Sequence, residues 1–479
     1  MYDVIIIGGG IIGVTTAKIL SKYRLEVAVI ERERDLGEGA SKSNSGVLAS
    51  GFHPRAGSLK GTSCVKGNEM YHEICEKLDV PVKFIGSLML AYSQDGIEKI
   101  EEKYKKGLAN GVPGMKFMDP EQVFEMEPAV SSNIVKALYS PTTGIVDVFK
   151  LLYHSAELAA INGVEFKRGT EVEKIEANRE GYRVITDKGE FKSRFIVNAA
   201  GENADKMEDF IEPCRFEIEP RRGQFFVFEK EEEPLIKHVI YQMQETDEKG
   251  IFITPTMGGN LIAGPTSENV PDYRYKETTE EGLKKVTRVA KKIIPSLDMS
   301  KVITSFAGLR ANISNVDKSE KDFVINRTKK GMVSALGIKN PGITSAPVLA
   351  ELIVEKLVED GLKLEEKDFY HDRFKADKKF FDCSLKEKEE LLKEDSDYGR
   401  VVCRCEKVTL GDIKKSLNGP IPPVNIDGLK RRLHIGMGKC QGGFCTPELI
   451  EILSKRWNVP PEKILKSGTG SQIVKGFLK

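Results

Sequence analysis

The chain has 479 residues, of which 40% are hydrophobic and 30% charged, with a formal net charge of +1. This length predicts roughly two to four folding units, and near-neutral, interspersed charges exclude the basic surface typical of nucleic-acid binding. No apolar run reaches the roughly 18 residues that a membrane span needs, and no secretory leader precedes the first strand, so we expect a cytoplasmic protein.

The first predicted elements form a βαβ unit. Residues 3–7 (DVIII) are a β-branched run typical of a buried parallel strand. The segment 8–13 (GGGIIG) follows, then apolar residues at helical spacing in 14–23, and a second strand, 26–30, that leads to Glu31. Strand, glycine turn, helix, strand and acidic residue in this order are the fingerprint of a dinucleotide-binding unit.

Each residue of this fingerprint has a physical reason. Gly8 permits the tight turn, Gly10 lets the backbone approach a pyrophosphate, and Gly13 lets the helix pack close to the strand. The helix N-terminus offers N–H groups to the phosphates, and Glu31 accepts hydrogen bonds from ribose hydroxyls. The alternative, a glycine-rich turn in an ordinary βαβ unit, would not require the acidic residue at this spacing.

Later segments favour FAD over NAD as the dinucleotide. Residues 37–51 (GEGASKSNSGVLASG) are small and polar, which suits backbone contact with a flavin. Residues 195–201 (FIVNAAG) read as a buried strand ending in small residues, and 332–349 as a strand, a glycine-containing loop and a helix start. Such a loop could place backbone N–H groups at the edge of the flavin ring.

From Met1 to about residue 370 these motifs resemble the D-amino-acid-oxidase-like superfamily of FAD enzymes, which includes glycerol-3-phosphate dehydrogenases and L-2-hydroxyglutarate oxidases. Further shared motifs are PRRGQ at 220–224 and GLR at 308–310. The resemblance implies an α/β fold, with a Rossmann-like FAD-binding domain interrupted by an antiparallel or mixed-sheet (α+β) substrate domain. The expected substrate-domain insertions are at about 80–150 and 215–305.

The resemblance also implies a set of residues that contact FAD. They are Gly8, Gly10, Ile11, Ile12, Gly13, Glu31, Arg32, Ser43, Asn44, Ser45, Val172, Ala200, Gly201, Gly308, Gly337, Gly342, Ile343 and Thr344.

Three residues are candidates for catalysis. Arg310 matches the family's arginine beside the flavin, whose fork of donors grips an anionic substrate group; a structural ion pair is the alternative. Lys339 lies where glycerol-3-phosphate dehydrogenases carry Gly-Gly-Lys, but PGITSAP (341–347) follows it, as in L-2-hydroxyglutarate oxidases. His53 is one of six histidines and could accept the substrate's hydroxyl proton, or be structural.

After a predicted linker at 371–398, four of the eight cysteines lie in two close pairs. Cys403-x-Cys405 and Cys440-x4-Cys445 can supply the four thiolates of a [2Fe–2S] cluster. Zinc is the alternative, although zinc sites favour C-x2–4-C spacing at both ends. The surrounding segments 403–413 (CRCEKVTLGDI) and 431–445 (RRLHIGMGKCQGGFC) resemble the bacterioferritin-associated-ferredoxin-like domain at the end of the large subunit of anaerobic glycerol-3-phosphate dehydrogenase. The resemblance implies such a domain over residues 399–479.

Within that domain, glycines are expected to let backbone N–H groups turn toward the cluster sulfurs. They are Gly436, Gly438, Gly442 and Gly443.

A flavin and an iron–sulfur cluster in one chain predict an enzyme that oxidises a small anionic substrate and exports electrons. Three hypotheses stay open. The first is oxidation of sn-glycerol 3-phosphate to dihydroxyacetone phosphate, with electrons passing to a protein or quinone acceptor. The second is a dehydrogenase of L-2-hydroxyglutarate or another 2-hydroxy or amino acid. The third is a non-catalytic electron-transfer subunit. The expected partner is a second flavoprotein or iron–sulfur subunit, through which the protein could be peripheral to a membrane.

Overall fold

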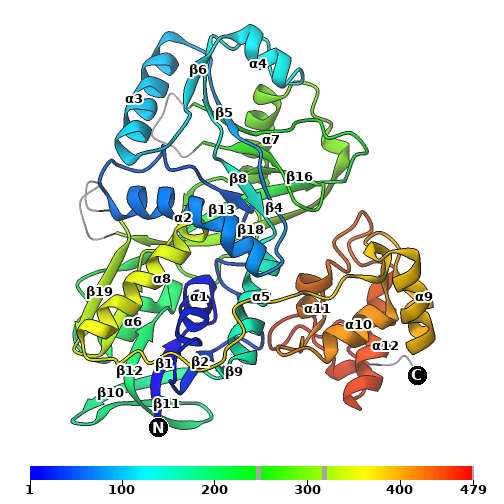
Figure 1. The fold of residues 1–479 in the computed structure, drawn as a ribbon. Helices are drawn as coiled ribbons and strands as arrows, with labels where there is room; N and C mark the ends of the chain where they lie inside the picture. Colours follow the sequence, from blue (N-terminus) through cyan, green and yellow to red (C-terminus); the bar gives the residue numbers. More distant parts are fainter. Residues whose placement is uncertain (244–249, 315–320, 477–479) are drawn as a thin grey trace.

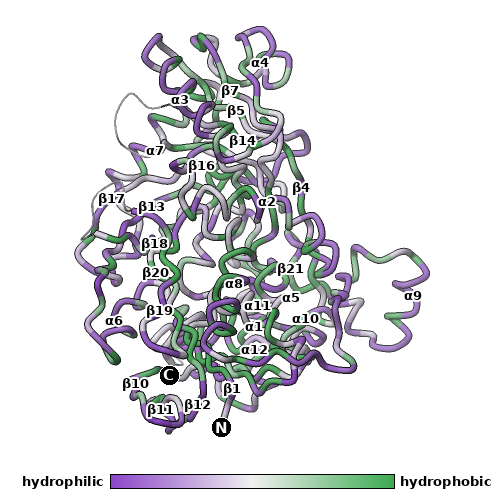
Figure 2. The backbone as a smooth tube through the Cα atoms, turned by 60° about the vertical axis from the view of Figure 1, so that its left-hand side comes forward, coloured by the Kyte–Doolittle hydropathy of each residue, from purple (hydrophilic) through white to green (hydrophobic). Residues whose placement is uncertain are grey.

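The computed structural model describes residues 1–243, 250–314 and 321–476. The chain forms an N-terminal body, a second body built on a mixed sheet, and a small C-terminal body beside the first (Figure 1). Hydrophobic stretches of the backbone run mainly through the interior and hydrophilic ones through the outer loops (Figure 2). Among the described residues, no helix is both long enough and apolar enough to cross a membrane.

An eight-stranded sheet is the centre of the N-terminal body in the described part of the chain. Its strands are β1 (Tyr2–Ile7), β2 (Val27–Glu31), β9 (Glu165–Arg168), β10 (Val172–Asn178), β11 (Gly181–Thr186), β12 (Gly189–Asn198), β19 (Val324–Lys329) and β20 (Met332–Leu336). Strands β9, β2, β1, β12 and β20 lie side by side and all pair in parallel, whereas β10, β11 and β19 add antiparallel neighbours. The predicted Rossmann-like α/β architecture is confirmed.

The strand β1 is apolar throughout because both of its faces are covered. Val4 and Ile6 pack into the core beneath the helices, whereas Ile5 and Ile7 pack with Tyr182 on the opposite face. The helices on the first face are α1 (Ile11–Leu20), α2 (Leu59–Lys77), α5 (Val148–Ile161) and α8 (Gly342–Glu359), and α6 (Ala204–Asp209) lies near β20.

The second body is a mixed sheet of nine described strands. They are β5 (Ser87–Ala91), β6 (Lys116–Met118), β7 (Lys136–Ser140), β13 (Ile218–Phe228), β14 (Val239–Gln242), β15 (Phe252–Pro255), β16 (Leu261–Gly264), β17 (Glu268–Asn269) and β18 (Val302–Ile313). The long antiparallel pair β13 and β18 runs toward the N-terminal body and places Arg221 opposite Arg310. The mixed sheet of the predicted substrate domain is therefore present.

Three further helices pack with this sheet, and a small sheet lies beside it. The helices are α3 (Gln94–Asn110), α4 (Pro120–Met126) and α7 (Glu280–Ile293), and the small sheet consists of β3 (Val47–Leu48), β8 (Gly144–Val146) and β4 (Val82–Phe84).

The C-terminal body has its own apolar core. Its elements are β21 (Val401–Cys403), β22 (Val408–Thr409), α10 (Leu410–Leu417), α11 (Ile426–Leu433) and α12 (Cys445–Trp457). Val408, Leu429 and Leu453 are fully buried at its centre. Before it, α9 (Leu385–Glu394) buries none of its residues, as expected for a charged linker helix. We propose the sequence-predicted boundaries, 1–370, 371–398 and 399–479, as the domain division.

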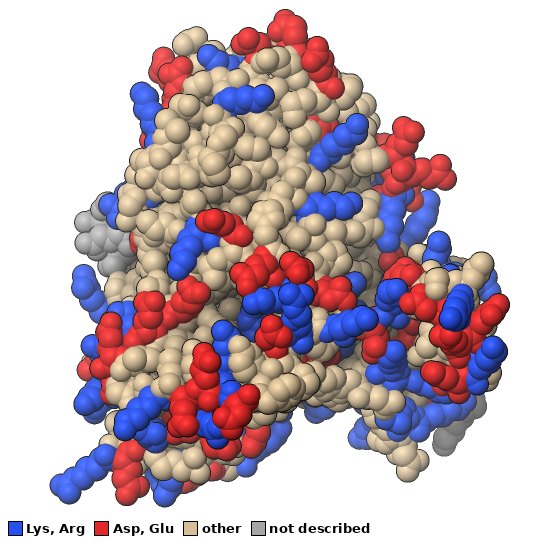
Figure 3. Space-filling model, in the orientation of Figure 1, with Lys and Arg blue, Asp and Glu red and all other residues tan. Residues whose placement is uncertain are grey.

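Acidic and basic side chains are interspersed over the face drawn in Figure 3, in agreement with the charge pattern of the sequence. That face carries no large surface of one sign, so it offers no long-range attraction to a polyanion.

Candidate active site

A cavity of about 1580 Å³ lies between the N-terminal body and the mixed sheet. Its lining extends from Gly8 and Glu31 of the βαβ unit to Arg310 of β18 and to Lys339 of the loop before α8. Pockets for a single small ligand usually measure about 300–1,000 Å³. The cavity is therefore large enough for a dinucleotide together with a small substrate.

The glycine turn forms one end of this cavity. Gly8 has φ +107°, and a Cβ there would lie 2.4 Å from the carbonyl oxygen of Ala199. A Cβ on Gly13 would lie 2.0 Å from the Gly8 carbonyl oxygen, so only glycine allows α1 to begin so close to β1. Among the described residues, a Cβ on Gly10 would meet only the Ser41 hydroxyl, at 3.4 Å, so the space beside the start of α1 is open. These observations fit a cradle for a pyrophosphate.

Glu31 lies at the end of β2, as the fingerprint predicts. Its two carboxylate oxygens accept hydrogen bonds from the backbone N–H groups of Gly9, at 2.7 Å, and Glu33, at 2.8 Å. Burial raises the pKa of Glu31 to about 7. Each carboxylate oxygen retains a further lone pair, which a ribose hydroxyl could use.

Fifteen of the eighteen predicted FAD contacts line the cavity. They are Gly8, Gly10, Ile11, Ile12, Glu31, Arg32, Ser43, Asn44, Ser45, Val172, Ala200, Gly201, Gly308, Gly342 and Ile343. The other three have packing positions: Gly13 is described above, Gly337 has φ +66° against the side chain of Ile313, and the Thr344 hydroxyl accepts a hydrogen bond from the Ala49 N–H at 2.9 Å. Contact of all eighteen with FAD stays a prediction.

Basic side chains from five segments form the other end of the cavity. They are Lys60, Arg221, Arg310, Lys321 and Lys339. Arg310 donates to the Thr266 carbonyl oxygen at 3.2 Å. Within the described residues, Arg310 Nη1 and Arg221 Nε are buried without a hydrogen-bond partner. Burial, and then the neighbouring Arg221, lower the pKa of Arg310 to about 10.

Two lysines that line the same end of the cavity are also desolvated. Lys339 donates to Asn312 Oδ1, and burial, followed by repulsion from Lys60 and Lys321, lowers its pKa to about 7. Lys60 donates to the Lys321 carbonyl oxygen at 2.6 Å, and burial lowers its pKa to about 8 although the nearby Asp322 carboxylate acts in the opposite direction. Several like charges gathered in a buried site are costly unless an anion joins them, so this end of the cavity is suited to an anionic group.

His53 lies at the exposed edge of the same cavity. Its ring is 4.3 Å from the ring of Phe52 and 5.2 Å from that of Tyr241, centroid to centroid. The structure thus brings the three catalytic candidates to one cavity, while their catalytic roles stay predictions.

Sequence reasoning missed several residues of the site. Ser41 accepts a hydrogen bond from the Ile11 N–H at 3.0 Å, and Lys60, Arg221 and Asn312 line the basic end of the cavity. Arg221 lies in the PRRGQ motif, which was a signal for it; Lys60 and Asn312 had none.

The four C-terminal thiols lie in two pairs. Cys405 Sγ is 4.0 Å from Cys440 Sγ, and the Cys403 and Cys445 side chains are hydrogen-bonded to each other. Two thiolates on one tetrahedral metal ion, with bonds of about 2.3 Å, would be about 3.8 Å apart. Among the described residues no group of three or more His, Cys, Asp or Glu side chains is gathered for a single ion. Two pairs, one for each iron, are what a [2Fe–2S] cluster requires.

Backbone N–H groups surround these thiols. Those of Phe444, Gly442 and Gly443 donate to Cys440 and lower its pKa, and that of Gly436 donates to Cys403. Three of the four glycines named from the sequence therefore direct N–H groups at sulfur. The fourth has a steric role, because a Cβ on Gly438 would lie 2.2 Å from the Cβ of Cys405.

Known proteins are similar to this chain over both parts. Residues 3–356 match the FAD dependent oxidoreductase family, and residues 401–455 match the BFD-like [2Fe-2S] binding domain. The chain is 40% identical to a glycerol 3-phosphate dehydrogenase of Caloramator mitchellensis, covering 100% of this chain and 99% of that protein. It is 26% identical to an L-2-hydroxyglutarate dehydrogenase of Indibacter alkaliphilus, covering 74% of this chain and 98% of that one.

A solved structure agrees with the fold. L-alpha-glycerophosphate oxidase from Mycoplasma pneumoniae, determined with FAD bound, is 28% identical and has a TM-score of 0.74, covering 79% of this chain and 99% of its own. The family matches confirm the predicted cofactors, which are FAD and a [2Fe–2S] cluster. Together with the similarity to the glycerol 3-phosphate dehydrogenase, they also confirm that the protein is an oxidoreductase. The chain belongs to the FAD dependent oxidoreductase family and carries a BFD-like [2Fe-2S] binding domain at its C-terminal end.

Proposed function

We propose that this oxidoreductase converts sn-glycerol 3-phosphate to dihydroxyacetone phosphate. The observation that carries the proposal is the basic end of the cavity, where buried N–H groups of Arg310 and Arg221 have no partner among the described residues. A phosphate group offers three acceptor oxygens and close to two negative charges. It could satisfy both arginines and the neighbouring lysines at once. The similarity to a glycerol 3-phosphate dehydrogenase over the full chain supports the same substrate.

In this proposal each side chain has a defined task. Arg310 and Arg221 bind the phosphate oxygens, and Lys339 and Lys60 add charge beside them. Lys339 also holds Asn312 through its hydrogen bond, which limits the movement of both side chains. His53, at the exposed edge of the cavity, accepts the proton of the C2 hydroxyl. Bound FAD supplies the two-electron acceptor for the hydrogen on C2.

Cys403, Cys405, Cys440 and Cys445 would hold the [2Fe–2S] cluster, which would supply a one-electron route to a protein or quinone acceptor. A flavin can accept two electrons together as a hydride and release them singly, so the two cofactors would be matched. The acceptor in this proposal is a second flavoprotein or iron–sulfur subunit. We propose a cytoplasmic location, with any membrane contact made through such partner subunits.

Oxidation of L-2-hydroxyglutarate or another 2-hydroxy or amino acid is the second candidate. It is supported by PGITSAP at 341–347 and by the similarity to L-2-hydroxyglutarate dehydrogenases. Its two carboxylates lie at opposite ends of the molecule, so only one of them could lie among the five cations. Glycerol 3-phosphate, with both charges on one group, makes better use of that end of the cavity.

Anaerobic bleaching of the flavin tests the proposal directly. The full-length protein with FAD bound is mixed with glycerol 3-phosphate, L-2-hydroxyglutarate, glycine or L-proline, and the loss of visible flavin absorbance is followed. We expect rapid bleaching by glycerol 3-phosphate alone. Bleaching by L-2-hydroxyglutarate alone would replace the first candidate by the second, and bleaching by none would contradict both.

A further inference from the structure

One surface loop contacts both cofactor-binding bodies. We call residues 35–42 (DLGEGASK), which follow β2, the junction loop. On one side this loop is bonded to the glycine turn: the Gly37 N–H donates to the Gly9 carbonyl oxygen at 3.0 Å, and the Ile11 N–H donates to Ser41 Oγ at 3.0 Å. Residues 37–41 line the cavity. The loop is therefore part of the wall around the dinucleotide site.

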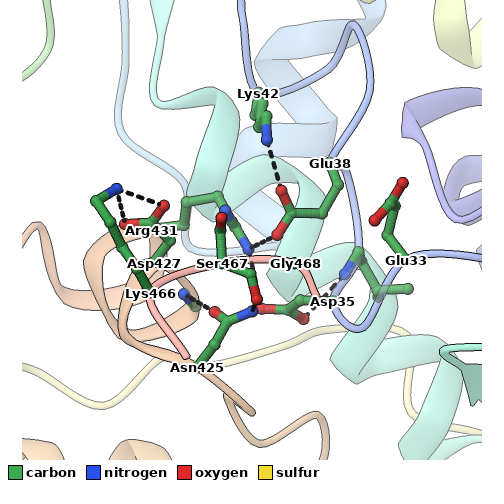
Figure 4. A network of polar contacts seen from close by, with 12 residues as sticks. Glu33, Asp35, Glu38, Lys42, Asn425, Asp427, Arg431, Lys466, Ser467 and Gly468 are labelled. Carbon is green, nitrogen blue, oxygen red and sulfur yellow. Dashed lines mark hydrogen bonds and ion pairs between the residues drawn. The ribbon is translucent and has the colours of Figure 1, made fainter. Parts of the chain in front are cut away.

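On its other side the junction loop is hydrogen-bonded to two arginines of α11, which belongs to the C-terminal body. Arg432 donates to both oxygens of Asp35, at 2.7 and 3.0 Å. Arg431 Nη2 reaches Glu38 at 2.6 Å and Asp35 at 3.3 Å (Figure 4). Glu38 lines the cavity, so a side chain of the cavity wall is bonded directly to the C-terminal body.

This contact is buried. The side chain of Asp35 is 0% exposed and those of Arg431 and Arg432 are 5% and 6% exposed. Burial alone would raise the pKa of Asp35, but Arg432, Arg431 and Arg168 outweigh that effect and hold it below its usual value. Removing one partner of a buried ion pair leaves the other charge unpaired and out of contact with water, which is costly. Loss of either arginine therefore destabilises the whole contact.

Close packing adds to the ion pairs at this contact. The Arg432 guanidinium lies 3.8 Å from the centroid of the Tyr153 ring of α5. A Cβ on Gly428 would lie 2.7 Å from Asp35 Oδ2, so α11 approaches the loop as closely as a glycine allows. The start of α11 is itself held within the C-terminal body, since the Asn425 amide donates to the Ser467 carbonyl oxygen at 2.9 Å.

The helix continues directly into the thiol region. It ends at Leu433, His434 adopts a left-handed conformation with φ +61°, and the Gly436 N–H donates to Cys403. A short series of contacts therefore connects the glycine turn, the junction loop, α11 and one of the four thiols.

We propose that the junction loop couples the two cofactor sites: FAD binding in the cavity and seating of the C-terminal body through Arg431 and Arg432 stabilise each other. FAD orders the loop from one side, and the arginines order it from the other, so each event lowers the cost of the next. By linkage the effect is reciprocal. Asp35, Arg431 and Arg432 are positioning residues in this scheme. The coupling goes beyond the proposed substrate, because it involves cofactor binding alone.

Two measurements on the full chain test the coupling. The first is the FAD dissociation constant of FAD-depleted protein, from the quenching of flavin fluorescence. The second is the rate at which a protease cleaves the largely exposed segment 371–379, with and without saturating FAD. We expect FAD to slow that cleavage in the parent protein. In Arg432→Gln the FAD dissociation constant should rise on the order of tenfold, and FAD should no longer slow the cleavage.

Matched variants separate coupling from general damage. Arg432→Lys keeps the charge without the two-pronged geometry and should be intermediate. Arg456→Gln removes an arginine of α12 that donates to Asn418 within the C-terminal body, and should behave as the parent. Iron content shows whether the C-terminal body remains folded. If Arg432→Gln loses iron, Arg431→Gln, which removes the bonds to Tyr153, Asp35 and Glu38 but leaves Arg432 on Asp35, takes its place with the same expectation.

Three results would overturn the proposal. They are an FAD dissociation constant within twofold of the parent in an iron-containing junction variant, cleavage of the parent that FAD does not slow, and an equal loss of FAD affinity in Arg456→Gln. None of these readouts uses a substrate, so they are independent of whether glycerol 3-phosphate is the substrate.

Discussion

The two ends of the large cavity are built from different materials. The glycine-turn end is formed mainly by backbone groups of one βαβ unit, with the Glu31 carboxylate beside them, and its shape depends on the missing side chains of Gly8, Gly10 and Gly13. The basic end consists of charged side chains that five segments of the chain bring together. Backbone recognition requires a local conformation, whereas charge recognition requires only that side chains meet in space.

We therefore expect one added side chain in the glycine turn to abolish FAD binding. At the basic end, by contrast, each substitution should remove only part of the turnover. Each of the following experiments tests one part of that comparison.

Gly10→Val should have the largest effect. A Cβ at this position points into the open space of the cradle, and a branched side chain would fill it, so we expect FAD content to fall from about one per chain to none. Far-ultraviolet circular dichroism should remain unchanged, because the added atoms enter the cavity. Gly258→Ala, in a turn where a Cβ has no neighbour closer than 3.5 Å, is the control and should retain FAD. Normal flavin content in Gly10→Val would show that the dinucleotide does not lie there.

Arg310→Ala should lower kcat/KM with the physiological substrate by an amount that corresponds to about 2–4 kcal/mol of lost transition-state stabilisation, since a buried anion would lose its two-pronged partner. Arg310→Lys should restore little of this loss. The measurement is steady-state turnover with an artificial dye as acceptor. Arg274→Ala, which removes an arginine that is 89% exposed, is the control. Turnover of Arg310→Ala equal to that of the control would remove the arginine from the site.

Lys339→Ala should have a smaller effect that depends on the substrate. Glycerol 3-phosphate concentrates its charge on one group and should lose about 1–2 kcal/mol in kcat/KM, whereas a single carboxylate held by Arg310 should lose less. The comparison uses glycerol 3-phosphate and L-2-hydroxyglutarate with the parent and the variant. An equal loss for both substrates would mean that Lys339 acts through Asn312, to which it donates, and not through substrate charge.

The smallest effect concerns pH. The pKa of Lys339 is lowered to about 7, so its ammonium is present below pH 7 and is lost as the pH rises through that value. Sulfate keeps its charge over this range, and as a competitive inhibitor it should bind roughly three- to tenfold more weakly at pH 8 than at pH 6. Lys339→Ala should show a flatter profile. His53→Gln should keep the parent's profile, and a flat profile there would assign the titration to the histidine instead.

Much of the site could be predicted because its signals are short-range. A glycine turn, a strand and an acidic residue within about thirty positions report a local backbone conformation, and that conformation forms as expected at Gly8 and Glu31. The four cysteines could be identified because thiols in close pairs are rare in an ordinary chain. The mixed sheet was expected from the family resemblance.

Other parts of the site had no local signal. Lys60 is one lysine of a helix start, and Asn312 is one residue of a strand; only the fold places them beside Lys339. Asp35 had no local signal either, because it looks like an ordinary acidic residue of a loop. Its partners, Arg431 and Arg432 of α11, lie almost four hundred positions later in the sequence.

The sequence by itself thus determined the dinucleotide-binding unit, the thiol pairs and the class of chemistry, because backbone conformation and rare residue types leave their mark within a few positions. The tertiary structure alone decided which cations share a cavity, which carboxylate receives the arginines of α11, and how the two cofactor-binding bodies meet. Electrostatic interactions depend on the distance between two side chains and on their burial, and neither can be predicted from the order of residues alone.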